Sequence, residues 1–193
     1  MSSNLREKIL RIMNEYIEAK REPFGGHSLG GFVRNDVTAE INSLPFIDTT
    51  KYVVTGSVGQ GNWASVPWVA IMNRRITVST QRGYYIVYLF NEDMQSVYLT
   101  LAQGVTETSK EEMVRIKTEI RESIPSSSKV KVDDDIRLGD SKKARDYALS
   151  TAAYIQYDAG QMPEEGVIVK DLQEMIYIYE NFMNRLHLVG QNF

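Results

Sequence analysis

The chain has 193 residues, of which 42% are hydrophobic and 24% charged, a balance typical of a folded globular domain. Its 22 basic and 25 acidic residues give a formal net charge of -3, which excludes nucleic-acid binding through bulk positive charge. The lack of cysteine excludes disulfides and cysteine nucleophiles, and two histidines cannot form a three-histidine zinc site. No apolar run is long enough to span a membrane and residues 1–10 lack a signal-peptide core, so we predict a cytoplasmic protein with no membrane partner.

The first fifty residues predict a helical lead-in. Apolar residues recur at spacings of three and four over residues 4–20, and Asn4 and Glu7 form a capping-box pattern at the start of this helix. Two Gly-Gly pairs within residues 23–31 indicate a mobile or tightly turned connection. A short helix is expected over residues 33–43.

Four segments in the middle of the chain are rich in β-branched and aromatic residues, which favour strands. The connections between them are too short for crossover helices, so we expect an antiparallel meander. The third segment is apolar on both faces, which predicts a central strand covered on both sides. The expected strands are residues 51–58, 66–72, 84–90 and 96–102.

The last ninety residues predict a helix, a strand and a second helix. Thr108 and Ser109 precede Glu111 and Glu112 in a doubled capping-box pattern, and the helix that they begin should stop at Pro125. The elements expected after it are a polar loop or edge strand over 126–135, a short helix within 138–149, a strand over 151–159 and a helix over about 167–186.

Together these elements predict one α+β domain over residues 1–193, with a mixed, mostly antiparallel sheet of about five strands. Helices at the N-terminus, in the middle and at the C-terminus should flank the sheet. Residues 1–50 form the helical lead-in, residues 51–104 the core strands and their loops, and residues 105–193 the helix-strand-helix completion.

The glycine-rich stretch GSVGQGNW, residues 56–63, lies between the first two expected strands. It is not a P-loop, because no GK[ST] follows, and it is not a Rossmann fingerprint, because its spacing is G-x-x-G-x-G and a strand follows. Two interpretations remain open. It is a hairpin loop that needs positive φ, or a projecting loop that lets the backbone approach a ligand, with Gln60 at its tip.

The two tryptophans flank this loop. Trp63 and Trp68 are five residues apart, so on one continuous strand they would face opposite sides of the sheet. One would then line a pocket while the other fills the core. The alternative is that both are core residues, which is the more usual fate of tryptophan in a strand.

Charged residues gather at two places. Arg74, Arg75 and Arg82 lie around the second expected turn with hydroxyl residues between them, a group that suits phosphate contacts or simply a solvated hairpin. The acidic run of residues 133–135 leaves open a metal-dependent nuclease. No Glu-x-Lys pattern accompanies it, and such runs are usually solvated surface.

The stretch from Gly56 to Gly104 resembles the N-terminal domain of McrB-like (also written MrcB-like) proteins, the recognition subunits of modification-dependent restriction systems. The resemblance is carried by GSVGQGNWASVPWVAIMN and by the aromatic-rich strands GYYIVYLFNEDMQSVYLTLAQG. It implies a domain that binds duplex DNA and flips a modified cytosine, 5-methyl- or 5-hydroxymethylcytosine, into a pocket without catalysing a reaction.

In that family the domain precedes a GTP-hydrolysing motor, which recruits a McrC-like nuclease subunit. GTP and magnesium would therefore belong to the motor, and we expect no cofactor in this chain. The sequence has no Walker A motif. We expect either the recognition part of a longer protein or a stand-alone relative, monomeric by itself and not an enzyme.

The resemblance also implies roles for individual residues. Gln60 takes the place of the side chain that fills the gap left by the flipped base, and Asn62 fixes its loop. Trp68 matches the family's pocket tryptophan. The other wall candidates are Tyr84, Tyr85 and Tyr88, and the phosphate contacts would come from Arg74, Arg75, Ser79, Thr80 and Arg82.

A protein-interaction module that uses the glycine loop and the aromatic strands is the remaining alternative. An open aromatic pocket beside residues 59–62 would favour the DNA reader. Two fully buried tryptophans under a flat surface would favour the interaction module.

Overall fold

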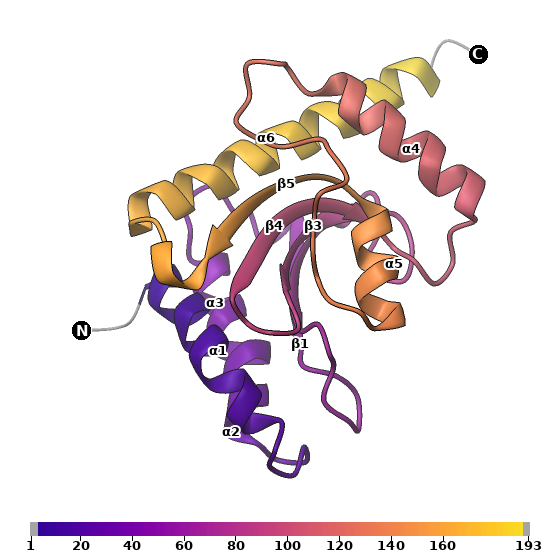
Figure 1. Cartoon of the computed structure of the whole chain (residues 1–193). Helices are drawn as coiled ribbons and strands as arrows, with labels where there is room; N and C mark the ends of the chain where they lie inside the picture. The colour runs from indigo at the N-terminus through magenta and orange to yellow at the C-terminus, as the bar shows by residue number, and fades with distance from the viewer. Residues whose placement is uncertain (1–3, 191–193) are drawn as a thin grey trace.

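The computed structural model describes residues 4–190, and side chains up to residue 186. Its centre is a five-stranded sheet in the order β1-β2-β3-β4-β5, curved as Figure 1 shows. The strands are β1 (Tyr52–Ser57), β2 (Trp68–Asn73), β3 (Tyr84–Phe90), β4 (Ser96–Gln103) and β5 (Thr151–Asp158).

Helices precede, interrupt and follow the strands. The lead-in holds α1 (Leu5–Ala19), α2 (Ser28–Gly31), the π-helix η1 (Phe32–Val37) and α3 (Thr38–Asn42). The remaining helices are α4 (Lys110–Ser123), α5 (Lys142–Ser150), the short 3-10 helix η2 (Ala159–Gln161) and α6 (Glu165–Gly190).

The predicted α+β class is confirmed, and the expected four-strand meander has the register of tight antiparallel pairs. The sheet is not mixed, because all four strand pairs of residues 4–190 are antiparallel. The long segment between β4 and β5 returns the chain antiparallel to β4. Residues 126–135 form a loop with a single bridge, Lys131 to Tyr154, onto β5.

The lead-in differs from the prediction in one respect. The second half of the expected connection 23–31 is helical, because the His27 imidazole accepts a hydrogen bond from the Leu29 backbone N–H and begins α2. The predicted start of α1 is confirmed. Asn4 and Glu7 form the reciprocal capping box.

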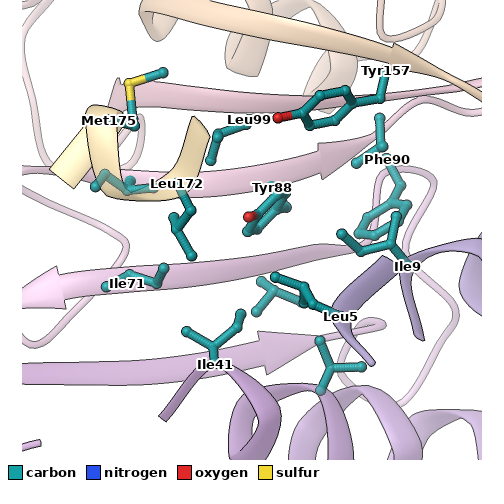
Figure 2. Close-up of a cluster of buried hydrophobic side chains, with 14 of the residues drawn as sticks. Leu5, Ile9, Ile41, Ile71, Tyr88, Phe90, Leu99, Tyr157, Leu172 and Met175 are labelled. Atoms are coloured by element: carbon teal, nitrogen blue, oxygen red, sulfur yellow. The ribbon is translucent and has the colours of Figure 1, made fainter. Parts of the chain in front are cut away.

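One face of the sheet, called here the closed face, is covered by α1, the lead-in helices and α6. Alternate strand residues meet the apolar stripes of these helices, as expected from the period of two in a strand. Figure 2 shows Tyr88 of β3 at the centre of this layer, between Leu172 of α6 and Leu5 of α1. Leu99 and Ile71 beside it are fully buried.

The other face, called here the hollow face, carries a smaller apolar cluster that α5 covers in part. Figure 1 shows α5 on the inner side of the curved sheet, with α6 and α1 on the outer side. The loops of residues 58–67 and 74–83, which leave the two ends of β2, border this inner side. Partial cover therefore leaves room for a cavity on the hollow face.

Candidate functional site

The glycine-rich loop is a tight, closed structure. The Ala64 backbone N–H donates to the Val58 carbonyl over 2.7 Å, which closes the loop at its base. Gly59 has φ +116, and a Cβ there would lie 2.0 Å from the Asn62 carbonyl oxygen. Only glycine fits that position. The interpretation as a loop that needs positive φ is therefore confirmed, while a close approach of its backbone to a ligand stays a prediction.

Trp63 anchors this loop to the helical lead-in. Its indole N–H donates to the Glu22 carbonyl over 2.9 Å, and its ring makes edge contacts with Tyr16, Phe24 and His27. The Tyr16 hydroxyl donates to the Ala64 carbonyl in the same place. Trp63 therefore serves the closed-face core, although it lies in the loop and not on a strand.

A cavity of about 380 Å³, called here the aromatic cavity, opens on the hollow face beside this loop. Its walls come from the 58–67 loop, the strands β2, β3 and β4, the 74–83 loop and α5. Trp68, Tyr85 and Tyr147 supply its aromatic rings. Both tryptophans are half-buried, and they differ as predicted in their surroundings: Trp68 lines the cavity, whereas Trp63 packs against the closed-face core.

The three aromatic side chains are fixed by polar contacts. The Tyr85 hydroxyl donates to the Thr80 carbonyl over 2.7 Å and so holds the 74–83 loop over the cavity. Burial raises the pKa of Tyr147, and a hydrogen bond from the Trp68 side chain opposes this rise. The Ser65 and Ser141 hydroxyls, 3.2 Å apart, link the glycine loop to the start of α5.

Tyr84 and Tyr88, two of the three tyrosines proposed as cavity walls, lie on the closed face. Tyr84 packs edge-on against Tyr179 and Phe182 of α6. Tyr88 is 1% exposed at the centre of the core. Because strand residues alternate between faces, Tyr85 is the tyrosine of β3 that lines the cavity.

Gln60 and Asn62 lie where the sequence places them, on the exposed part of the glycine loop, and both line the aromatic cavity. Gln60 also borders a second depression of about 390 Å³, called here the arginine hollow. Ser79, Thr80 and Arg34 contribute to this hollow. Thr80 lines both spaces, so the two loops lie along a single depression.

The three arginines proposed as phosphate contacts are exposed at the end of β2 and on the 74–83 loop, outside both spaces. The Arg82 guanidinium pairs with Glu107 over 3.4 Å. Arg74 reaches the Thr49 carbonyl over 3.4 Å. Arg75 has no side-chain partner within residues 4–190.

Charge is distributed unevenly around the two spaces. The cationic side chains that line them are Lys143 in the aromatic cavity and Arg34 in the arginine hollow. Within the described part of the chain, no Asp or Glu lines either space. For a chain with 25 acidic residues, this local exclusion of carboxylates favours an anionic or electron-rich ligand.

The acidic run of residues 133–135 has structural contacts. Asp133 accepts from the Tyr154 hydroxyl, and Asp134 pairs with Lys117 and Arg121, both over 2.8 Å. The Arg121 and Lys117 side chains lower the pKa of Asp134 to about 2. In the described residues, no three His, Asp or Glu side chains gather closely enough to hold a metal ion.

Sequence reasoning missed three residues of the site. Tyr147 lies on α5, and its only signal was an aromatic residue in a short helix after the acidic loop. Lys143, one turn earlier, places its ammonium 5.8 Å from the Tyr147 ring. Arg34 lies in η1, and no local pattern indicated that this helix would reach the strand edge.

Residues 4–190 include no helix with both the length and the apolar character needed to cross a membrane. Comparison with curated proteins finds no match for the chain. The family model described as "MrcB-like, N-terminal domain" matches residues 11–184, which is most of the chain and includes every residue of the cavity. The chain therefore belongs to the family of MrcB-like N-terminal domains, a membership that suggests a DNA-binding role in restriction systems.

Proposed function

We propose that this chain binds duplex DNA and takes a modified cytosine, flipped out of the helix, into the aromatic cavity. The observation that carries the proposal is the cavity itself, with three aromatic side chains, loop amides and no lining carboxylate among the described residues. Its volume of about 380 Å³ lies within the roughly 300–1,000 Å³ of small-molecule sites. A single base with a 5-methyl or 5-hydroxymethyl group is a ligand of this class.

The energetics are consistent with this role. Pulling a base out of the stack costs a few kcal/mol. Stacking on an aromatic side chain returns about 1–3 kcal/mol per base, so more than one aromatic contact is needed to offset the cost. Trp68, Tyr85 and Tyr147 supply three rings in one cavity.

Gln60 is the residue that we propose to enter the space vacated by the base. It is exposed on a loop whose base is fixed by the Val58–Ala64 hydrogen bond and by Trp63. A rigid loop base keeps the ordering cost of insertion low. Glutamine can hydrogen-bond to the orphaned partner base, while Asn62 lines the cavity mouth.

Arg74, Arg75 and Arg82 would then contact phosphates beside the cavity and supply a sequence-independent part of the affinity. For a chain with a net charge of -3 we expect few such contacts, and each should add about one unit to the slope of log affinity against log salt concentration. We propose a binding role without catalysis and without a cofactor for this chain. A McrC-like nuclease subunit, reached through a motor domain in a longer protein, and a cytoplasmic location complete the proposal.

The two alternatives have less support. In a nuclease reading, Asp133 and Asp134 would have to give up Tyr154, Lys117 and Arg121 to bind a metal ion. In a protein-interaction reading, the surface beside residues 59–62 would be flat and both tryptophans fully buried. The aromatic cavity and the half-buried Trp68 favour the DNA reader instead.

The test is an equilibrium titration of one duplex that carries cytosine, 5-methylcytosine or 5-hydroxymethylcytosine at the same position. We expect tighter binding to at least one modified duplex than to the unmodified one. Equal affinity for all three duplexes, or no binding to any, would refute the proposal. Magnesium-dependent cleavage of the duplex by the chain alone would favour the nuclease instead.

A further inference from the structure

We propose that the arginine hollow binds a backbone phosphate next to the flipped nucleotide, with Arg34 as its principal ligand. This inference rests on the proposed function, because it takes the flipped base in the aromatic cavity as its reference point. Neither the sequence pattern nor the family match assigns a role to Arg34.

The arginine hollow lies directly beside the aromatic cavity. The arginine hollow and the aromatic cavity share lining residues, among them Gln60, Trp68 and Thr80. A base that stacks on Trp68 therefore brings its own sugar-phosphate backbone to the boundary between the two spaces. The backbone must continue from that boundary, and the hollow is the adjoining depression.

The side chains that line the arginine hollow suit a phosphate group. Arg34 is exposed, and its guanidinium makes no ion pair within the described part of the chain. The same hollow is lined by the hydroxyl residues Thr55, Ser57, Ser79 and Thr80, and by no carboxylate of residues 4–190. A guanidinium with hydroxyl groups around it is the arrangement that binds phosphate through short, charge-assisted hydrogen bonds.

The fold also holds Arg34 in place. A Cβ on Gly56 of β1 would lie 2.6 Å from the Val33 carbonyl oxygen, so the missing side chain lets η1 pack directly on the strand. A Cβ on Gly30 would lie 2.9 Å from the Arg34 Nη1 atom, so the guanidinium rests against the bare backbone of α2. Arg34 also lies in a π-helix, a rare form that is frequent at functional sites.

The contrast with the other candidate cations strengthens the assignment. Arg82 is paired with Glu107, and Arg74 contacts the Thr49 carbonyl. Both would have to give up a protein contact to bind DNA, whereas Arg34 would not. Arg75 also has no side-chain partner among the described residues, but it lines neither space, whereas Arg34 lines the arginine hollow. We therefore expect Arg34 to be the strongest single phosphate contact of the domain.

The experiment is a phosphate-neutralisation scan. Each phosphate around the modified cytosine is replaced in turn by an uncharged methylphosphonate, and each duplex is titrated with the wild-type chain and with Arg34→Ala. For the wild type, neutralising one phosphate adjacent to the modified cytosine should lower the affinity roughly tenfold. For Arg34→Ala, the loss at that one position should disappear, while losses at the other positions remain.

Arg115→Ala is the matched control. Arg115 is an exposed arginine on α4 that lines neither space, and its substitution changes the net charge by the same amount as Arg34→Ala. It should keep the wild-type scan. Arg34→Lys keeps the charge but loses the two-pronged guanidinium, so its scan should fall between those of the wild type and Arg34→Ala.

Gly30→Ala offers a second, independent variant. It leaves every charge in place but displaces the Arg34 guanidinium from its position against α2. It should therefore reproduce part of the change that Arg34→Ala makes in the phosphate scan. A thermal melt of Arg34→Ala and of Gly30→Ala checks that each variant is folded.

A scan that is identical for the wild type and Arg34→Ala would overturn the phosphate assignment. The preference for modified cytosine in wild-type titrations would be untouched by that result. The converse result is also informative. If Arg34→Ala removes the loss at one phosphate but the wild type shows no preference for modified cytosine, the phosphate site in the arginine hollow is supported and recognition of modified cytosine is refuted.

Discussion

The two faces of the sheet are built from the same strands but differ in how their side chains are used. On β3, Ile86 and Tyr88 pack into the closed face under α1 and α6. Their neighbours Tyr85 and Val87 face the aromatic cavity. A strand that is apolar throughout can therefore supply a core on one side and a binding surface on the other, and the covering helices decide which side is which.

Two tyrosines of β3 that face opposite sides of the sheet also differ in what their hydroxyls do. Tyr88 is fully buried, and its hydroxyl has no hydrogen-bond partner in the described structure. The Tyr85 hydroxyl holds the 74–83 loop through the Thr80 carbonyl. At Tyr88 the tyrosine acts as a large apolar residue, whereas at Tyr85 the polar end of the side chain organises the site.

The largest effect should come from the closed face. Leu99→Ala removes a fully buried side chain between β4 and the covering helices, and should lower the free energy of unfolding by about 2–5 kcal/mol. The DNA affinity of the molecules that remain folded should not change. Urea unfolding measures the first quantity, and Val114→Ala, at an exposed position on α4, is the control that should leave stability unchanged.

The converse effect should come from the hollow face. Trp68→Ala removes one stacking ring and should weaken binding to modified DNA by about 1–3 kcal/mol, with a smaller loss for unmodified DNA. Trp68→Phe should recover most of the affinity. The measurement is a titration of matched modified and unmodified duplexes. An equal loss of affinity for both duplexes would show that Trp68 has only a structural role.

Tyr88 and Tyr157 lie in the same core, and their hydroxyls should contribute to the free energy of unfolding with opposite signs. Tyr88→Phe deletes an unpartnered buried hydroxyl and should raise the free energy of unfolding by about 1 kcal/mol. Tyr157→Phe deletes a hydroxyl that donates to the buried Asp171 over 2.6 Å, and should lower it by about 1–3 kcal/mol. A destabilised Tyr88→Phe variant would mean that the hydroxyl has a partner in solution.

A smaller effect concerns pH. The pKa of Asp134 is lowered from 3.8 to about 2 by Arg121 and Lys117. Its ion pairs therefore stabilise the fold above pH 3.8, and this contribution is lost as the pH falls toward 2. Asp134→Asn should remove that part of the acid sensitivity, while Asp135→Asn should not. Because Asp134 is exposed, we expect only a small shift in urea midpoints between about pH 4 and about pH 2, the window set by these two pKa values.

The strands of the fold could be predicted because their signals are local. β-branched runs, turn residues and capping boxes placed the four central strands, α1 and α4 close to their observed bounds. The predicted mixed sheet was wrong, because the direction of β5 depends on how α4 and α5 return the chain. No local sequence pattern within residues 104–150 predicts the course of the chain between β4 and β5.

The site was predictable only in part for the same reason. The positions of Trp68 and Gln60 beside the glycine loop followed from the residues that carry the resemblance to MrcB-like domains, and their roles in DNA binding stay predictions. The choice between Tyr85 and Tyr88 needed the packing of α6, because β3 is apolar on both faces. Arg34 and Tyr147 reach the site from distant segments, so only the tertiary structure brings them to the two spaces.

The central claim is that the hollow face receives a base taken out of the DNA stack. Its most direct test places the fluorescent base 2-aminopurine beside the modified cytosine in a duplex and records its emission on binding. We expect a rise in emission with the wild-type chain on the modified duplex, and a much smaller rise with Trp68→Ala at saturating concentration. Tight binding of the modified duplex with unchanged emission would contradict it.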